Sequence, residues 1–198
     1  MGARIVAIVG SYRKGGTVDT AVEALLAGAR EKGAITQTIY LTEQNIEFCT
    51  NCRQCMQAPG EERGKCPQRD DLESVLSAVE SSDALVLASP VNCYNVTAIF
   101  RRLMERLVGF AYWPWGQNGP RARTKRQPRR AVLIAASAMP GFLIPIATGA
   151  ARALRLTADM MGARTVGKMW IGLAAVAPHT PLSKRTQQRA RQLGLKLA

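Results

Sequence analysis

The sequence predicts an α/β fold, an open five-stranded parallel sheet with helices on both faces. Short apolar runs alternate with longer segments whose apolar residues recur at helical spacing, and this alternation repeats five times. The runs are nearly continuous in apolar residues, which is typical of strands covered on both faces. At 198 residues, 47% of them hydrophobic and 21% charged, the chain is long enough for a single domain over residues 1–198 with a sizeable core.

The first predicted strand, residues 4–9, leads into a loop over residues 10–17 that is rich in glycine and hydroxyl side chains. An amphipathic helix follows, and its N-terminus would present unpaired N–H groups and a positive dipole end to the loop, which suits a phosphate. Neither G-x-x-x-x-G-K-[ST] nor G-x-G-x-x-G is present, so the two common nucleotide loops are excluded. The loop is therefore predicted to bind the phosphate of a mononucleotide such as FMN, the alternative being an ordinary turn with incidental hydroxyls.

The remaining elements follow from hydrophobic periodicity and from capping and turn residues. The further strands are expected over residues 35–41, 83–88, 131–136 and 165–171. The further helices are expected from Asp70 or Asp71, from Asn95 or Thr97 to Arg106, and over residues 146–161 and 182–197. Residues 43–69 show no sustained period and are expected to form a loop.

Three loops are candidates for a ligand site. In an open parallel sheet, ligands bind beyond the carboxyl ends of the strands, where the strand order reverses. The loops over residues 10–17, 89–97 and 137–141 each follow a predicted strand and are rich in Ser, Asn, Thr, Gly or Pro. Together they are predicted to form a cofactor pocket.

The loop without periodicity contains four of the five cysteines, Cys49, Cys52, Cys55 and Cys66. The two-residue gaps match those of bacterial ferredoxins, so the four thiolates could ligate a [4Fe–4S] cluster. Zinc is a second possibility, and free thiols that bind nothing are a third. Cys93 lies in another loop and is expected to be structural or close to a cofactor.

Charge is distributed unevenly along the chain. Residues 1–120 carry 12 Lys/Arg and 13 Asp/Glu, a net charge of −1, whereas residues 121–198 carry 15 against the single acid Asp159, a net charge of +14. The basic run over residues 120–130 is either a solvated loop or a surface that attracts an anionic partner, such as the extra phosphate of NADPH. Binding to nucleic acid is not expected, because no recognised binding motif accompanies the charge.

The chain is expected to be cytoplasmic and not to enter a membrane. No signal peptide precedes the first strand, and the cysteines suit a reducing compartment. Residues 131–151 carry no charge, but Pro140, Gly141 and Pro145 interrupt the run, which argues against a transmembrane helix.

Two further features have ordinary explanations. His179, the only histidine, lies in a loop near the C-terminus and is expected to be solvated rather than catalytic. The aromatic run Tyr112–Trp115 could stack on a flavin, but it is expected to pack at a subunit interface.

Taken together, these motifs resemble a known family. The segment Gly10–Thr17, the four-cysteine loop, Asp70–Asp71 and Ser89–Thr97 look like the corresponding parts of the flavodoxin-like NADPH-dependent FMN reductase family. The cysteine loop is similar to that of iron–sulfur flavoproteins. The resemblance covers about residues 3–175 and implies a flavodoxin-like three-layer sandwich with a five-stranded parallel sheet, the cysteine loop being inserted at about residues 45–69.

The resemblance also implies an oxidoreductase that passes electrons from NAD(P)H through bound FMN to a quinone-like, flavin or iron–sulfur acceptor. A flavodoxin-like electron carrier without its own NAD(P)H activity is the alternative. Homodimers or homotetramers are typical of the family. The expected cofactor-binding residues are Ser11, Arg13, Gly16 and Thr17 around the phosphate, Pro90, Val91, Asn92, Tyr94 and Asn95 along the isoalloxazine, and the 137–141 loop, with Ser137 and Gly141, at its other edge.

Overall fold

The computed structural model describes residues 2–124, 126–176 and 180–198. Its centre is a five-stranded, all-parallel sheet in the order β2-β1-β3-β6-β7. The strands are β1 (Arg4–Val9), β2 (Ile35–Tyr40), β3 (Ala84–Pro90), β6 (Arg129–Ala136) and β7 (Ala163–Ile171). The predicted fold class is confirmed, and each strand agrees with its expected range to within two residues.

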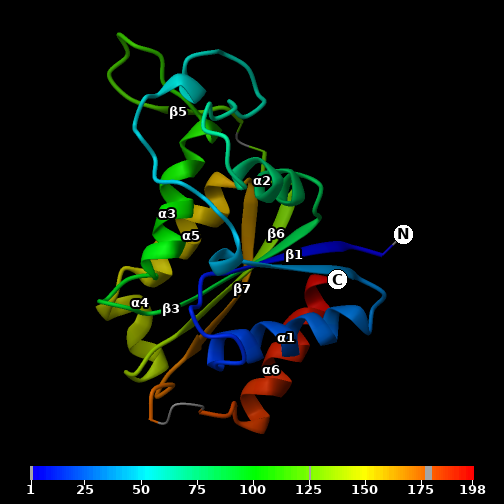
Figure 1. Cartoon of the computed structure of the whole chain (residues 1–198). Coiled ribbons are helices and arrows are strands. Elements are labelled where there is room, and N and C mark those ends of the chain that lie inside the picture. The colour runs from blue at the N-terminus through cyan, green and yellow to red at the C-terminus, as the bar shows by residue number, and fades with distance from the viewer. Residues whose placement is uncertain (1, 125, 177–179) are drawn as a thin grey trace.

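Helices cover both faces of the sheet, which makes three layers (Figure 1). On one face lie α1 (Thr17–Arg30) and α6 (Lys184–Leu197). On the other lie α2 (Leu72–Glu80), α3 (Ala98–Arg106) and α5 (Ala150–Met160). No helix in the described ranges is both long and apolar enough to cross a membrane.

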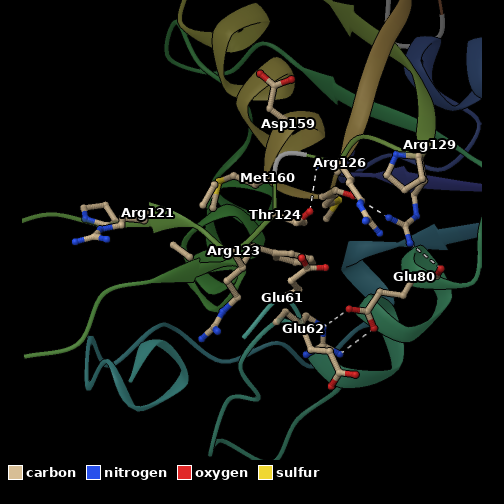
Figure 2. Close-up of a pocket in the computed structure, with 18 of the residues that line it drawn as sticks. Glu61, Glu62, Glu80, Arg121, Arg123, Thr124, Arg126, Arg129, Asp159 and Met160 are labelled. Atoms are coloured by element: carbon tan, nitrogen blue, oxygen red, sulfur yellow. Dashed lines mark hydrogen bonds and ion pairs between the residues drawn. The ribbon is translucent and has the colours of Figure 1, made fainter. Parts of the chain in front are cut away.

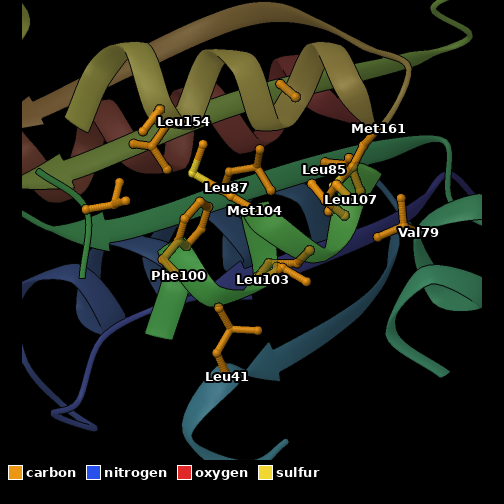
Figure 3. Packing of buried hydrophobic residues seen from close by; sticks show 14 of the residues in the cluster. Leu41, Val79, Leu85, Leu87, Phe100, Leu103, Met104, Leu107, Leu154 and Met161 are labelled. Carbon is orange, nitrogen blue, oxygen red and sulfur yellow. The ribbon is translucent and has the colours of Figure 1, made fainter. Parts of the chain in front are cut away.

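The larger of the two apolar cores lies between the sheet and the α2–α3–α5 face. Figure 3 shows Phe100, Leu103 and Leu107 in one cluster with Leu87 of strand β3 and Leu154 of helix α5. Phe100 is fully buried, and its ring lies directly behind the loop that follows β1. The core therefore supports the predicted cofactor loop from below.

The shorter elements lie mainly in the connections. They are the 3₁₀ turns η1 (Leu41–Glu43), η2 (Gln54–Met56), η3 (Leu107–Phe110) and η4 (Gly141–Leu143), the short helix α4 (Ile144–Ala147), and the antiparallel pair β4 (Ala111–Tyr112) and β5 (Arg121–Ala122). The sequence reasoning missed β4 and β5, which are two residues long and carry no periodic signal.

The helix predicted over residues 146–161 is divided in the structure. Thr148 is extended, and the N–H of Gly149 donates to the carbonyl of Tyr94 at 2.8 Å, a tertiary contact that separates α4 from α5. A helix needs consecutive helical dihedrals, so the extended Thr148 ends α4. The prediction was wrong at this point because the contact comes from a distant loop.

Helices α1 and α6 meet at a glycine. A Cβ built on Gly194 would lie 1.8 Å from the carbonyl oxygen of Leu25, so no side chain fits there without moving a helix. We expect Gly194→Ala to lower the free energy of unfolding by about 2 kcal/mol, because an overpacking cost of about 3 kcal/mol outweighs a helix-propensity gain of about 1 kcal/mol. Urea unfolding measures the change, and Gly119→Ala, where a Cβ would meet open space, is the control that should stay near wild type.

Candidate functional site

A cavity of about 420 Å³ opens at the carboxyl ends of β1, β3 and β6, where the strand order reverses between β1 and β3. The three predicted loops contribute to its wall, together with the segment after β7. The predicted cofactor-binding residues that line it are Ser11, Arg13, Gly16, Thr17, Pro90, Val91, Asn92 and Ser137. The sequence reasoning did not single out Tyr12, Val18, Ala136, Ala138, Ala174 and Ala175, which complete the wall.

Three predicted cofactor-binding residues do not line this cavity. Tyr94 is 69% exposed at the tip of its turn. Asn95 accepts from the N–H of Val96 through its side chain, and its side-chain amide packs beside Gly149. Gly141 packs against the backbone of Trp170 and Gly172. Direct contact of these three with a flavin stays a prediction.

The loop after β1 is anchored at its first residue, Gly10, by hydrogen bonds with the neighbouring segments. Gly10 donates to the carbonyl of Ala88 at 2.8 Å and accepts from the buried hydroxyl of Thr97 at 2.6 Å. Any Cβ at Gly10 would lie 2.8 Å from the Phe100 side chain, so the close approach requires glycine. The loop therefore has a fixed position above the core.

The N-terminus of α1 faces this cavity. Its N-cap is Gly16, and no described side chain accepts a hydrogen bond from the first-turn N–H groups at the cap. Gly16 and the first two helical residues, Thr17 and Val18, all line the cavity. Free amides, a helix dipole and adjacent hydroxyls make a site for an anion such as a phosphate.

The acid in the first turn of α1, Asp19, reaches back to the residue before the N-cap. The carboxylate of Asp19 accepts from the N–H of Gly15 at 2.6 Å and from the hydroxyl of Tyr40 at 2.7 Å. Burial, followed by the hydrogen bond to Asp19, raises the pKa of Tyr40 to about 12. Tyr40 therefore stays protonated at neutral pH and keeps donating to Asp19.

The turn after β3 has an unusual backbone. Asn92 and Asn95 exchange two backbone hydrogen bonds of 2.8 and 2.9 Å, and the two residues between them, Cys93 and Tyr94, have φ angles of 46° and 61°. Neither is glycine, and positive φ at two successive non-glycine residues costs free energy. Cys93 and Tyr94 are exposed in this strained turn, directly after Asn92, which lines the cavity.

The four cysteines of the 45–69 segment line a second, small pocket of about 20 Å³, together with Arg106. Asn51 and Arg53 have φ angles of 55° and 58°, which turn the chain twice between the first three cysteines. Cys55 is buried, Cys52 is exposed, and Cys49 and Cys66 are half-buried. The described residues contain no group of three or more His, Cys, Asp or Glu side chains arranged to hold a metal ion.

Two thiols in this pocket, Cys52 and Cys55, have pKa values shifted in opposite directions. Burial raises the pKa of Cys55, and the charges of Cys66, Cys49 and Cys52 raise it further. A hydrogen bond from the backbone N–H of Gln54 lowers the pKa of the exposed Cys52 thiol. The charges of the three other cysteines act on Cys55, so the four side chains lie close together in one pocket.

A buried ion pair lies beside the thiols. The side chains of Arg106 and Asp70 are each 1% exposed, and they are joined by hydrogen bonds of 2.5 and 3.3 Å. Burial acts to raise the pKa of Asp70, but hydrogen bonds from Arg106 and from the N–H groups of Glu47 and Leu72 outweigh it and hold that pKa below its usual value. The same guanidinium donates to Cys66 Sγ at 3.3 Å.

The aromatic run after α3 packs on the cysteine loop rather than on the cavity at the strand ends. The guanidinium of Arg53 lies between the rings of Trp113 and Trp115, 3.8 and 4.2 Å from their centroids, and donates to the carbonyl of Trp113 at 2.7 Å. Neither tryptophan lines the cavity at the strand ends. A role of this run in a subunit interface stays a prediction. His179 lies outside the described residues.

A larger cavity, about 820 Å³, lies near the N-terminal ends of β6 and β7, at the other end of the strands (Figure 2). Charges of both signs line it, including the basic run at 120–130 and the acids Glu61, Glu62 and Asp159. The smaller cavity is the candidate for the predicted cofactor despite this difference in size, because ligands of parallel sheets bind at the carboxyl ends of strands. No described residue of the basic run lines that smaller cavity.

Two arginines of the basic run are structural, so the alternative of a solvated loop does not hold for these two residues. Arg129 donates to the carbonyls of Val79, Glu80 and Met161, which end α2 and α5. Burial lowers its pKa, although the charges of Glu80 and Asp83 oppose this. Arg123 donates to the carbonyls of Cys55, Ala58, Gly60 and Gly109 at 2.8–3.2 Å.

We expect Arg123→Ala to loosen the cysteine loop. Hydrogen bonds to charged groups are worth about 1.5–3 kcal/mol, so the local opening constant should rise at least about tenfold. The rate of trypsin cleavage at Lys65, which is exposed in this loop, measures the opening. The control is Arg121→Ala on the same ribbon, an exposed position that should leave the rate unchanged; equal rates for both variants and wild type would contradict the prediction.

Comparison with known proteins gives a match of residues 3–177 to the family described as NADPH-dependent FMN reductase. An iron–sulfur flavoprotein of Archaeoglobus fulgidus is 33% identical over 111 residues, which are 56% of this chain and 48% of that protein. Iron–sulfur flavoprotein MJ1083 of Methanocaldococcus jannaschii is 32% identical over 103 residues, 52% of this chain and 51% of the relative. The chain thus spans about half the length of the curated relatives it matches.

Solved structures share the fold at low sequence identity. An NAD(P)H:quinone oxidoreductase from Methanothermobacter marburgensis is 16% identical, with a TM-score of 0.69 and 100% of both chains covered. An FMN-dependent NADH-azoreductase from Bacillus anthracis, solved in complex with FMN, is 12% identical, with a TM-score of 0.71 and coverage of 98% of this chain and 99% of that one. An archaeal flavodoxin also matches, with a TM-score of 0.57, 12% identity and coverage of 98% and 95%.

Proposed function

Because the chain belongs to the NADPH-dependent FMN reductase family, we propose that it is an oxidoreductase that binds FMN in the cavity at the carboxyl ends of β1, β3 and β6. The observation that carries the proposal is the uncapped N-terminus of α1, which faces this cavity beside the hydroxyls of Ser11 and Thr17. The 420 Å³ volume lies in the usual range for a cofactor pocket. In this proposal the whole chain is one FMN-binding domain with the cysteine loop inserted at about residues 45–69.

The residues of the cavity fit FMN in kind. The amides of the first turn of α1, with Ser11 and Thr17, would hold the phosphate, and Arg13 would add a positive charge. The backbone of Pro90–Asn92 and Ser137 would lie along the ring system, where the alanines at 136, 138, 174 and 175 leave room for a flat group. FMN bound there would supply the redox chemistry, the transfer of a hydride equivalent from NAD(P)H to an acceptor.

We further propose that the four cysteines hold a [4Fe–4S] cluster. The donor set fits in number and chemistry, because four thiols line one pocket and a cluster requires four thiolates. Four thiolate donors suit iron–sulfur chemistry, whereas a zinc site would need the four sulfur atoms to converge on one ion. The pocket is narrow, and the turn with the exposed Cys52 would have to move outward to admit the cluster.

The electron acceptor is proposed to be a small molecule of the quinone type, or the cluster itself. The structural relatives include a protein named as an NAD(P)H:quinone oxidoreductase and another named as an FMN-dependent NADH-azoreductase. Assembly into a homodimer or homotetramer, which the family resemblance implies, remains part of the proposal. A cytoplasmic location, which the cysteine usage suggests, also remains part of it.

Steady-state oxidation of NADPH and of NADH with a benzoquinone, under anaerobic conditions, tests the activity. An oxidoreductase should consume NAD(P)H in proportion to quinone, with one reduced quinone formed per nucleotide oxidised. A protein that binds FMN but oxidises neither nucleotide would instead be an electron carrier of the flavodoxin kind, which would contradict the proposed activity.

A further inference from the structure

The guanidinium of Arg106 is buried, and it donates hydrogen bonds to other groups besides its ion-pair partner Asp70. Arg106 is the last residue of α3, and its side chain is 1% exposed. Nη1 donates to Asp70 Oδ2 and to the carbonyl of Glu47, at 2.5 and 2.6 Å. Nη2 donates to Asp70 Oδ1 and to Cys66 Sγ, both at 3.3 Å. Asp70 and Glu47 would suffice to neutralise and orient the charge, so the contact with sulfur is an additional feature of the site.

The contact suits a thiolate better than a thiol. A neutral thiol is a weak acceptor, whereas an ionised sulfur accepts a charge-assisted hydrogen bond. Burying a guanidinium is costly, and a buried donor that faces a weak acceptor recovers little of that cost. Within the described part of the chain, Arg106 is the charged side chain that donates to a cysteine sulfur of this pocket.

Helix α3 also connects the two sites. At its N-terminus, the Thr97 hydroxyl donates to the carbonyl of Gly10 in the loop beneath the flavin cavity. At its C-terminus, Arg106 reaches the cysteine pocket. The helix has nine residues, so it spans about 13 Å at 1.5 Å per residue. This one helix therefore fixes the position of Arg106 relative to both loops.

We propose that Arg106 is a positioning residue of the metal cluster, which orients the Cys66 thiolate and raises the reduction potential of the cluster; this inference rests on the cluster proposed above. A positive charge beside a cluster that carries four thiolates stabilises the more negative, reduced form, and hydrogen bonds to cluster sulfur act in the same direction. The ion pair with Asp70 would keep the guanidinium in place whether or not the cluster is present.

The test compares Arg106→Lys and Arg106→Met with wild type after anaerobic reconstitution with iron and sulfide. Iron affinity should fall about 10- to 100-fold in Arg106→Met, as is typical when an outer-shell partner is lost. The midpoint potential of the remaining cluster, followed by electron paramagnetic resonance, should shift to a more negative value. Arg106→Lys keeps the positive charge but lacks the planar guanidinium. Its midpoint potential and its iron affinity should therefore lie between those of wild type and Arg106→Met.

Arg63→Met is the matched control. Arg63 is another nearly buried arginine, 7% exposed, and it ties the cysteine loop to α2 through Glu73 and Glu80 without a contact to any sulfur of the pocket. This variant should lose thermal stability while its cluster keeps the wild-type potential. A potential shift in Arg63→Met equal to that in Arg106→Met would reduce Arg106 to a structural residue, and an unchanged potential and iron content in Arg106→Met would overturn the inference.

Measuring FMN and iron on the same samples shows whether the proposed cluster or only the role of Arg106 has failed. Wild-type protein that binds FMN but no iron would overturn the proposed cluster and the role of Arg106 with it. Wild-type protein with a cluster that Arg106→Met leaves unaltered would overturn the role of Arg106 alone. Should the Arg106 variants fail to fold, wild-type protein labelled with guanidino-¹⁵N arginine decides the matter: nitrogen coupling to the reduced cluster is expected, and its absence would overturn the inference.

Discussion

Replacing Thr17 with glutamate is expected to weaken FMN binding about a thousandfold. Thr17 is the first residue of α1 and lines the cavity where the phosphate is proposed to bind. Two like charges about 4 Å apart near a protein surface repel by about 4 kcal/mol, which corresponds to about three orders of magnitude in affinity. Titration of the apoprotein with FMN, followed by quenching of flavin fluorescence, measures the loss.

The same substitution should not destabilise the fold. An acidic residue in the first turn of a helix is favourable by about 0.3–1 kcal/mol, so the melting temperature of the apoprotein should stay level or rise. Thr20→Glu is the control, because Thr20 is exposed on the next turn of the helix and does not line the cavity. Equal FMN affinity in the two variants would place the phosphate elsewhere.

Removing one cysteine is expected to abolish the cluster while leaving the flavin bound. Cys52 is exposed, so Cys52→Ala removes a proposed ligand without opening a hole in the core. A four-iron cluster with three ligands loses most of its stability, and iron should fall from about four atoms per chain to near zero. Iron and sulfide assays, with FMN quantified on the same sample, give the result.

Cys93→Ala is the matched control for that experiment. Cys93 is also exposed, but it lies in the turn after β3 and does not line the cysteine pocket. Its substitution should leave iron content at the wild-type level. If both variants or neither variant lost iron, the proposed assignment of Cys52 as a ligand would be wrong.

The fold could be predicted because its signal is local and repeated. Five apolar runs separated by amphipathic segments leave few alternatives to a parallel sheet with helices on both faces, and the right-handed crossovers of such sheets restrict the topology further. The division between α4 and α5 could not be predicted in this way, because it depends on a hydrogen bond from Gly149 to Tyr94, far away in the sequence.

Part of the site was predictable because its signal is also local in the sequence. Hydroxyl and amide residues directly after a buried strand indicate a ligand loop, and the cavity is lined by most of the residues expected from the three loops. The alanines at 174 and 175 carry no chemical signal, so nothing in the sequence marked the segment after β7.

The arginines that organise the cysteine loop were not predictable from the sequence. Arg53, Arg106 and Arg123 look like ordinary surface charges in a basic chain. In the structure each is committed to a partner far away in the sequence: two tryptophan rings, a buried aspartate and thiol, and a set of backbone carbonyls. Such roles depend on tertiary geometry, which periodicity and spacing do not encode.

The most direct test of the central claim is an ultraviolet–visible spectrum of the protein purified without oxygen, with FMN, iron and sulfide assayed on the same sample. An FMN-binding oxidoreductase with the proposed cluster should show flavin bands over the broad absorption of an iron–sulfur centre, with stoichiometric FMN. A colourless protein that stayed colourless after incubation with FMN would contradict the assignment of the cavity.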